Sequence, residues 1–290
     1  MPNHVLKADG VLVFVTILAA AGWFFSLFAM RGMPPLLFIA ARFLLAGAVL
    51  SVLGWRALVR MNVRLVLRAC LSGLAMWVSI TLWAEAVVQT SNLGVGAFLS
   101  SLGNIAAPIL GWVMFRTPIA PQTWWGVALA MAGMACMSLG KGGLSYGPAD
   151  LMFLASAVAA SLYLNFNSRF VARIPPLSLA AIQLSVVGLL SLAGVLVRGD
   201  VAVTLTPEVI GWFLASVLIA TSLRYFLLVK GQKTAPISHA ALIMILEPVW
   251  TALLAAVLLG STITGLQLVG CLLIFLALVL HQMPWWRRSS

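Results

Sequence analysis

The sequence predicts an all-α polytopic membrane protein with ten transmembrane helices, built as an inverted repeat of five plus five. Three observations support this prediction. Only 8% of the 290 residues are charged and 63% are hydrophobic, with a mean hydropathy of +1.11. Long apolar runs follow one another along the chain, and the first half can be matched to the second. Because a soluble domain carries about 25% charged residues, a soluble enzyme, a secreted disulfide-stabilised protein and a disordered chain are excluded.

The apolar runs are separated by charged residues, Pro and Gly and define ten segments. They lie at about 11–30, 35–55, 66–88, 93–115, 123–140, 150–170, 177–197, 208–229, 237–259 and 264–283. Strands are excluded because the runs are long, do not alternate, and lipid cannot satisfy open sheet edges. Short connections predict that neighbouring helices form antiparallel hairpins.

Basic residues predict the orientation of these spans. Arg31, Lys141 and Arg198 fall on one side of the membrane, Arg42 and Arg224 lie inside spans, and the remaining twelve Lys and Arg residues fall on the other side. The positive-inside rule therefore places both termini in the cytoplasm. The expected location is the inner (plasma) membrane of the cell. The net charge of +11 then faces lipid headgroups, so no nucleic-acid partner is expected.

An internal duplication appears when the chain is shifted along itself. At an offset of 141, Pro34-Pro35-Leu36 falls on Pro175-Pro176-Leu177 and Gly47 on Gly188; at 144, Gly126 falls on Gly270. We therefore divide the chain into repeats at 1–145 and 146–290. Since five is odd, the second repeat enters the membrane upside down, and inverted repeats of this kind are typical of transporters that work by alternating access.

Two stretches of the sequence, one in each repeat, resemble a known family. Leu246-Glu247-Pro248-Val249-Trp250 in the ninth span and Ala41-Arg42-Phe43-Leu44 in the second are similar to the EamA branch of the drug/metabolite transporter superfamily. The resemblance covers nearly the whole chain. It implies a basket of helices in which the first, third, fourth, sixth, eighth and ninth spans line a central cavity, while the fifth and tenth brace the outside or a dimer contact. A monomer and a homodimer both remain open.

Four ionisable residues lie inside spans, where each costs at least ~2.5–3.5 kcal/mol unless it is compensated. Their depths predict two ion pairs, Arg42–Glu85 near the outer face and Arg224–Glu247 in the inner half. Pro248 removes a backbone donor beside Glu247 and predicts a bend there. The pairs either act as gates during transport or only stabilise helix packing, and Glu247 is a candidate for proton coupling.

Polar and aromatic side chains at mid-depth are the candidates for binding substrate. Three pairs stand at helical spacing: Trp77 with Thr81, Ser100 with Asn104, and Tyr163 with Asn167. Trp23 lies midway along the first span, and Tyr225 lies beside Arg224. Such groups suit a solute with an apolar body and a polar head. The alternative is that Ser and Thr join helices and that Trp and Tyr anchor them at the interface.

No enzymatic pattern occurs: there is no Gly-rich phosphate loop, no HExxH and no GxSxG. We therefore expect no catalytic residues, no cofactor and no metal. The expected function is secondary export of small metabolites, with neutral amino acids, aromatic ones included, as the first choice. The alternatives are a broader amphipathic drug or metabolite exporter and, in a different class, a membrane scaffold or lipid-handling protein.

Overall fold

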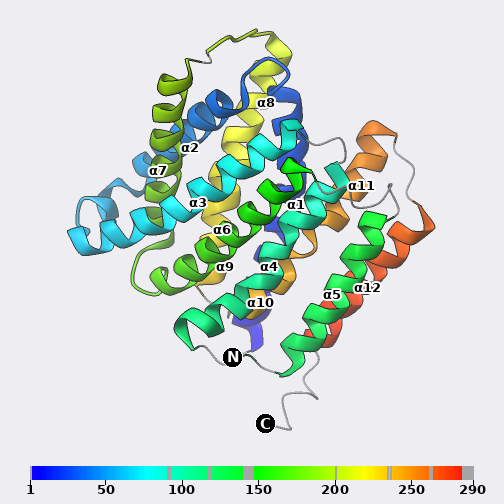
Figure 1. Cartoon of the computed structure of the whole chain (residues 1–290). Helices are drawn as coiled ribbons and strands as arrows, with labels where there is room; N and C mark the ends of the chain where they lie inside the picture. Colours follow the sequence, from blue (N-terminus) through cyan, green and yellow to red (C-terminus); the bar gives the residue numbers. More distant parts are fainter. Residues whose placement is uncertain are drawn as a thin grey trace.

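A computed structural model describes residues 2–89, 93–116, 119, 121–139, 147–199, 201–233, 235, 237–260 and 264–282. All regular secondary structure in these ranges is helical (Figure 1). The helices are α1 (Pro2–Ala29), α2 (Pro35–Leu58), α3 (Val63–Gln89), α4 (Leu93–Phe115), α5 (Pro121–Leu139), α6 (Pro148–Phe170), α7 (Pro176–Arg198), α8 (Pro207–Val217), the π-helix η1 (Leu218–Leu223), α9 (Arg224–Gln232), α10 (Ile237–Met244), α11 (Glu247–Leu259) and α12 (Gly265–Gln282).

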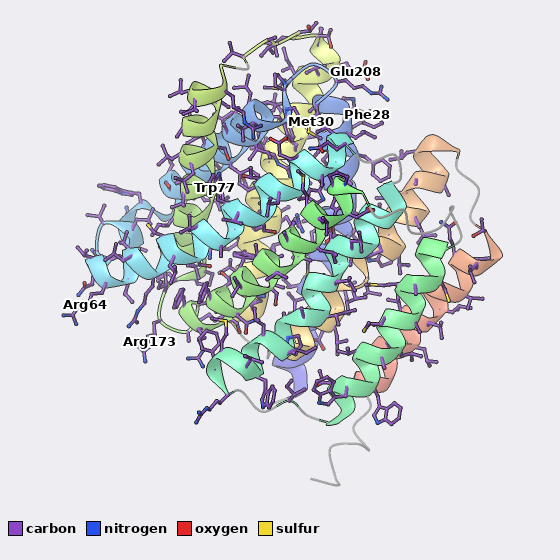
Figure 2. All side chains as sticks on the ribbon, viewed as in Figure 1. Phe28, Met30, Arg64, Trp77, Arg173 and Glu208 are labelled. Carbon is purple, nitrogen blue, oxygen red and sulfur yellow. The ribbon has the colours of Figure 1, made fainter. Side chains whose placement is uncertain are left out.

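Seven helical segments of the described ranges are long and apolar enough to cross a membrane. They are Asp9–Ala29, Pro35–Leu58, Val63–Gln89, Pro148–Phe170, Pro176–Arg198, Pro207–Gln232 and Ala240–Leu258, with shorter apolar stretches at Leu99–Phe115, Thr123–Cys136 and Gly265–Ala277. The all-α, multi-pass prediction is therefore confirmed. Side chains in Figure 2 show the two ends of the molecule, with Arg64 and Arg173 at one end and Phe28, Met30 and Glu208 at the other.

Helices α2 and α7 pack closely, because glycines allow their backbones to approach each other. A Cβ placed on Gly47 would lie 2.9 Å from the backbone nitrogen of Ser185. One on Gly194 would lie 3.1 Å from the Leu36 side chain. The residue numbers at the contacts thus decrease along α7 as they increase along α2, so the two helices run antiparallel. The two helices lie side by side in Figure 1.

Helices α5 and α12 form a second antiparallel pair at the right of Figure 1. A Cβ on Gly133 would lie 2.8 Å from the carbonyl oxygen of Gly270, and one on Gly126 would lie 3.8 Å from that of Ala277. Close backbone approach at small residues is the usual way in which helices associate in lipid, where no hydrophobic effect drives them together.

Two long segments are interrupted near their middles. Between α10 and α11 the chain makes two tighter turns, with Ile245 N–H donating to Leu242 O at 3.2 Å and Leu246 N–H to Ile243 O at 3.0 Å. Pro248 lacks the N–H that would continue the α-helix across this point, and the helix is interrupted directly before it, where the sequence predicts a bend. The second interruption is the π-helix η1, which separates α8 from α9.

Candidate functional site

A cavity of about 160 Å³ lies among α1, α2, α3, α4, α6, α9 and α11. Its walls combine aromatic rings, hydroxyl groups and three charged side chains. The polar and aromatic lining residues are Trp23, Ser26, Phe38, Arg42, Phe43, Ser79, Trp83, Ser100, Ser156, Arg224, Tyr225 and Glu247. The cavity therefore offers both apolar surface and charge to a small solute.

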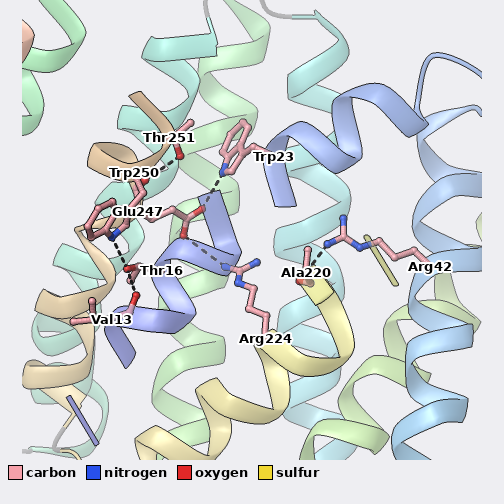
Figure 3. A network of polar contacts seen from close by, with 9 residues as sticks. All are labelled: Val13, Thr16, Trp23, Arg42, Ala220, Arg224, Glu247, Trp250 and Thr251. Atoms are coloured by element: carbon pink, nitrogen blue, oxygen red, sulfur yellow. Dashed lines mark hydrogen bonds and ion pairs between the residues drawn. The ribbon is translucent and has the colours of Figure 1, made fainter. Parts of the chain in front are cut away.

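Glu247 is the centre of one polar group in this cavity. The indole Nε1 of Trp23 donates a hydrogen bond to Glu247 Oε1 at 2.9 Å, and Nη2 of Arg224 lies 3.6 Å from Oε2. Figure 3 shows Glu247 between the two. The predicted Arg224–Glu247 pair is thus confirmed. Glu247 is the first residue of α11, where the helix dipole also favours a carboxylate.

Arg42 forms a second group, held by neutral oxygens only. Its guanidinium donates to Thr221 Oγ1, to Ser26 Oγ at 2.7 Å and to the carbonyl of Ala220 at 3.3 Å. The guanidinium carbon also lies 5.5 Å from the ring centroid of Phe38. Arg42 is only 6% exposed and, within the described ranges, no carboxylate pairs with it.

The π-helix supplies two of these acceptors. In an α-helix the N–H of Arg224 would bond the carbonyl of Ala220, but here it bonds Ile219 O and Thr221 O instead. The Ala220 carbonyl is thus available to Arg42. The hydroxyl of Thr221 donates to Ser216 O, five residues earlier, at 2.8 Å, so its oxygen is oriented to accept from Arg42. π-turns of this kind often occur at functional sites.

An aromatic wall completes the cavity. The rings of Trp23 and Trp83 meet edge to face, with centroids 4.8 Å apart and planes at 82°, an arrangement that aromatic pairs favour. Ser79 and Ser156, which also line the cavity, cross-link α3 and α6, since each hydroxyl donates to the other residue's carbonyl, at 3.0 and 2.8 Å. This bond holds two of the lining helices in register.

A smaller cavity of about 60 Å³ adjoins the first and shares Trp23, Ser100 and Glu247 with it. Asn104, Pro248 and Thr251 also line it. Eight of the residues that the sequence predicted thus line one of these two cavities: Trp23, Arg42, Ser100, Asn104, Arg224, Tyr225, Glu247 and Pro248.

The predicted Arg42–Glu85 pair is wrong. Glu85 pairs instead with Arg198, whose side chain is 56% exposed. The reason is the packing order: α3 lies mainly against α6 and α7 and makes little contact with α2. The carboxylate near the end of α3 therefore meets the arginine at the end of α7, outside the cavity.

Four further candidates lie outside both cavities. Asn167 is fully buried and bonds Gln232 and Gln183, with the latter at 2.9 Å. It belongs to a polar contact that joins α6, α7 and α9. Trp77, Thr81 and Tyr163 have buried polar atoms without a hydrogen-bond partner in the described part of the chain, and none of them lines either cavity.

Sequence reasoning missed Ser26, Ser79, Trp83, Ser156 and Thr221, which line the main cavity or hold Arg42. Ser26 could have been predicted, because it is a hydroxyl residue in the first span and the buried Arg42 needs hydrogen-bond acceptors. The role of Thr221 has no signal in the sequence, because a π-turn leaves no periodic pattern.

Comparisons with known proteins agree with this architecture. The sequence profile of the EamA-like transporter family matches residues 6–139 and again 147–281. The chain is 27% identical over 195 residues to the uncharacterized transporter YwfM of Bacillus subtilis, covering 66% of this chain and 65% of that protein. It is 31% identical over 147 residues to the uncharacterized inner membrane transporter YicL of Salmonella typhimurium, covering 50% of this chain and 49% of YicL.

An uncharacterized transporter of Archaeoglobus fulgidus is 26% identical over 208 residues, covering 72% of this chain and 66% of that protein. The chain thus spans less than two thirds of the length of each of these relatives. A solved crystal structure superposes with a TM-score of 0.82 over 98% of this chain and 99% of that one. At 18% identity, that likeness shows the fold alone.

Proposed function

The chain belongs to the EamA-like transporter family, and from this premise we propose that it exports neutral amino acids, aromatic ones included, by alternating access. The described residues include seven apolar helices long enough to span a membrane. Together with its family membership, this makes the chain a multi-pass membrane transporter of the drug/metabolite type. The identity of the solute rests on the chemistry of the cavity.

The observation that carries the proposal is that Arg42 has no carboxylate partner among the residues that the structure describes. Arg42, Arg224 and Glu247 line the cavity, so its formal charge is +1. Arg224 and Glu247 compensate each other, which leaves Arg42 as a buried cation facing the cavity. A buried charge is costly without a partner, and a solute carboxylate would supply one.

The other groups fit the rest of an amino acid. Glu247 would accept its ammonium group, and Trp23 and Trp83 offer a ring surface to an apolar side chain. A volume of about 160 Å³ is well below the ~300–1,000 Å³ of pockets for drug-sized ligands. This favours a small metabolite over the alternative of a broad amphipathic drug exporter.

Alternating access is supported by the way equivalent helices pack. A Cβ on Gly47 would meet Ser185, and one on Gly188 would lie 2.6 Å from the backbone nitrogen of Leu44. At the offset of 141, Gly47 corresponds to Gly188 and Leu44 to Ser185. The two contacts are therefore copies of each other, as a two-fold axis requires. Because α2 and α7 run antiparallel, that axis would lie in the membrane plane.

In this proposal the chain crosses the membrane ten times, in two inverted five-helix repeats that divide near residue 146, with both termini in the cytoplasm. The break before Glu247 and the π-turn before Arg224 would let the segments beside the cavity change angle. Breaking the Arg224–Glu247 pair would accompany opening, and Glu247 would take up a proton if transport is proton-coupled.

Counterflow in liposomes tests the solute. Purified protein would be reconstituted with unlabelled amino acids inside, and uptake of labelled phenylalanine, leucine, lysine and glutamate would be compared. We expect trans-stimulated uptake of the neutral amino acids only. Uptake of charged amino acids at equal rates, or none for any amino acid in vesicles that hold folded protein, would overturn the proposal.

A further inference from the structure

A second and larger pocket, of about 410 Å³, shares no lining residue with the central cavity and lies among the start of α3, the end of α4 and the end of α6. Its charged lining residues are Arg68, Arg169 and Arg173. Its apolar lining includes Leu65, Phe115, Phe166 and Phe170. Arg64 and Arg173 mark this end of the molecule in Figure 2.

The three arginines have no counter-charge in the described part of the chain. None of the residues that line the pocket is acidic, and the whole sequence contains only six Asp and Glu residues. All three side chains are exposed. Arg169 packs its guanidinium 3.8 Å from the ring centroid of Phe115, which orients it at the pocket rim and leaves its N–H donors available.

The apolar part of the pocket is shaped by stacked rings. Phe166 and Phe170 are parallel, with centroids 5.8 Å apart and planes at 3°, and Phe115 meets Phe166 at 6.3 Å. Arginine donors and an aromatic floor thus occur together where three spans end. This is where the phosphate and the upper acyl chains of a phospholipid are found.

The repeat correspondence shows that the fold itself does not require this pocket. At the same offsets of 141 and 144, Phe166, Arg169 and Arg68 correspond to Phe25, Phe28 and Trp212. There the Trp212 ring packs 5.7 Å from Phe25 and 5.0 Å from Phe28. At that end of the molecule the equivalent positions hold an aromatic cluster, whereas at the basic end arginines border an open pocket.

We propose that this pocket binds the phosphate headgroup of an anionic phospholipid, with Arg68, Arg169 and Arg173 as its donors and the three phenylalanines against its glycerol and acyl carbons. A soluble phosphate would use the arginines but not the aromatic floor. The lipid also bridges α3, α4 and α6, which line the central cavity with Trp83, Ser100 and Ser156.

Native mass spectrometry of the intact chain, released from detergent with phosphatidylglycerol or phosphatidylcholine, tests the site. We expect phosphatidylglycerol to be retained in preference, and each of Arg68→Gln, Arg169→Gln and Arg173→Gln to weaken its retention about fivefold. The matched control is Arg64→Gln, which removes the same charge one turn earlier on α3 from an exposed residue outside the pocket. It should leave retention unchanged.

Each other outcome counts against the proposal. An equal loss with Arg64→Gln would show diffuse attraction to the basic end and no defined site. Equal retention of phosphatidylcholine would remove the role of charge. Displacement of the lipid by millimolar glycerol 3-phosphate would assign the pocket to a soluble phosphate. The variants should keep the wild-type melting temperature in lipid-free neutral detergent, which separates loss of binding from loss of folding.

Discussion

Trp23 and Glu247, which are 224 residues apart in the sequence, meet inside the molecule through a hydrogen bond of 2.9 Å. The bond joins α1 to the first residue of α11, directly after the break that precedes this helix. A single donor from one repeat thus fixes the carboxylate of the other. A movement that carries Glu247 away from α1 would lengthen or break this bond.

Removing the Trp23 donor should therefore impair transport. Trp23→Phe keeps most of the ring but loses the N–H, and a hydrogen bond to a charged group contributes ~1.5–3 kcal/mol. We expect the rate of counterflow to fall about tenfold or more. Trp250→Phe is the matched control, because Trp250 donates to Thr16 at 3.0 Å across the same two helices but outside the cavities. Equal losses in both variants would point to helix packing.

Arg42 should bind the carboxylate of the substrate. Wild-type protein is expected to take up phenylalanine at least about tenfold better than phenylalaninamide, which lacks the charge that Arg42 would pair with. Arg42→Gln should abolish that preference. Arg31→Gln, which removes an exposed arginine packed 4.9 Å from the Phe28 ring, should keep it. If Arg42→Gln protein still prefers the acid to the same extent, Arg42 does not bind the carboxylate.

The Arg224–Glu247 pair should show coupling in a double-mutant cycle. Both side chains are less than one-fifth exposed (18% and 19%), so either single change to Gln leaves a poorly solvated charge without its partner. Each single variant should melt several degrees lower in detergent, which corresponds to a loss of ~1–3 kcal/mol in the free energy of unfolding. The double variant should recover part of that loss. Strictly additive effects would show that the two charges do not interact.

The same variants address proton coupling. If Glu247 carries the proton, counterflow by the wild type should respond to an imposed pH gradient, while Glu247→Gln should not. A variant that keeps the wild-type rate and pH response would eliminate Glu247 from any coupling role.

Close packing of α2 against α7 should be sensitive to a single methyl group. Gly188→Ala places its Cβ 2.6 Å from the backbone of Leu44, which must move, and such overpacking costs ~1–3 kcal/mol. Gly47→Ala should have a similar effect at the equivalent contact. Gly211→Ala, where a Cβ meets nothing within 4 Å, should be neutral or slightly stabilising. Thermal melting in detergent measures all three, and an unchanged Gly188→Ala protein would refute the contact.

Orientation can be tested by labelling from outside the cell. In a chain whose Cys70, Cys136 and Cys271 are replaced by Ala, single cysteines would be placed at Arg64 and Glu208, which lie at opposite ends of the molecule (Figure 2). A membrane-impermeant maleimide added to whole cells should label Glu208→Cys only. Labelling of Arg64→Cys in intact cells would reverse the predicted topology.

The helical spans were predictable because lipid imposes one simple condition. Backbone groups must be satisfied within the segment, and side chains must be apolar over most of its length, so α2 begins at Pro35, as the sequence predicts, and ends at Leu58. The break beside Pro248 was predictable for an equally local reason, the missing N–H.

Contacts between helices were harder to predict, because hydropathy does not specify which spans pack together. Glu85 was assigned to Arg42 on depth alone, yet α3 packs against α7 and brings Glu85 to Arg198. Asn167 shows the same limit, since hydropathy does not indicate whether a mid-depth amide faces a cavity or another helix. Arg224 and Glu247 were paired correctly because consecutive segments of one repeat place them at similar depth.

The π-helix also determines how the following helix is rotated. A widened turn holds about one residue more than an α-turn, so every later position is rotated by ~100° about the axis compared with an uninterrupted helix. If the same residues wound as an uninterrupted α-helix, the composition and hydropathy of the segment would be unchanged. Arg224 would nevertheless lie about a quarter of the circumference away from its present position opposite Glu247. In this segment the type of turn, and not only the identity of the residues, sets which side chains face the cavity.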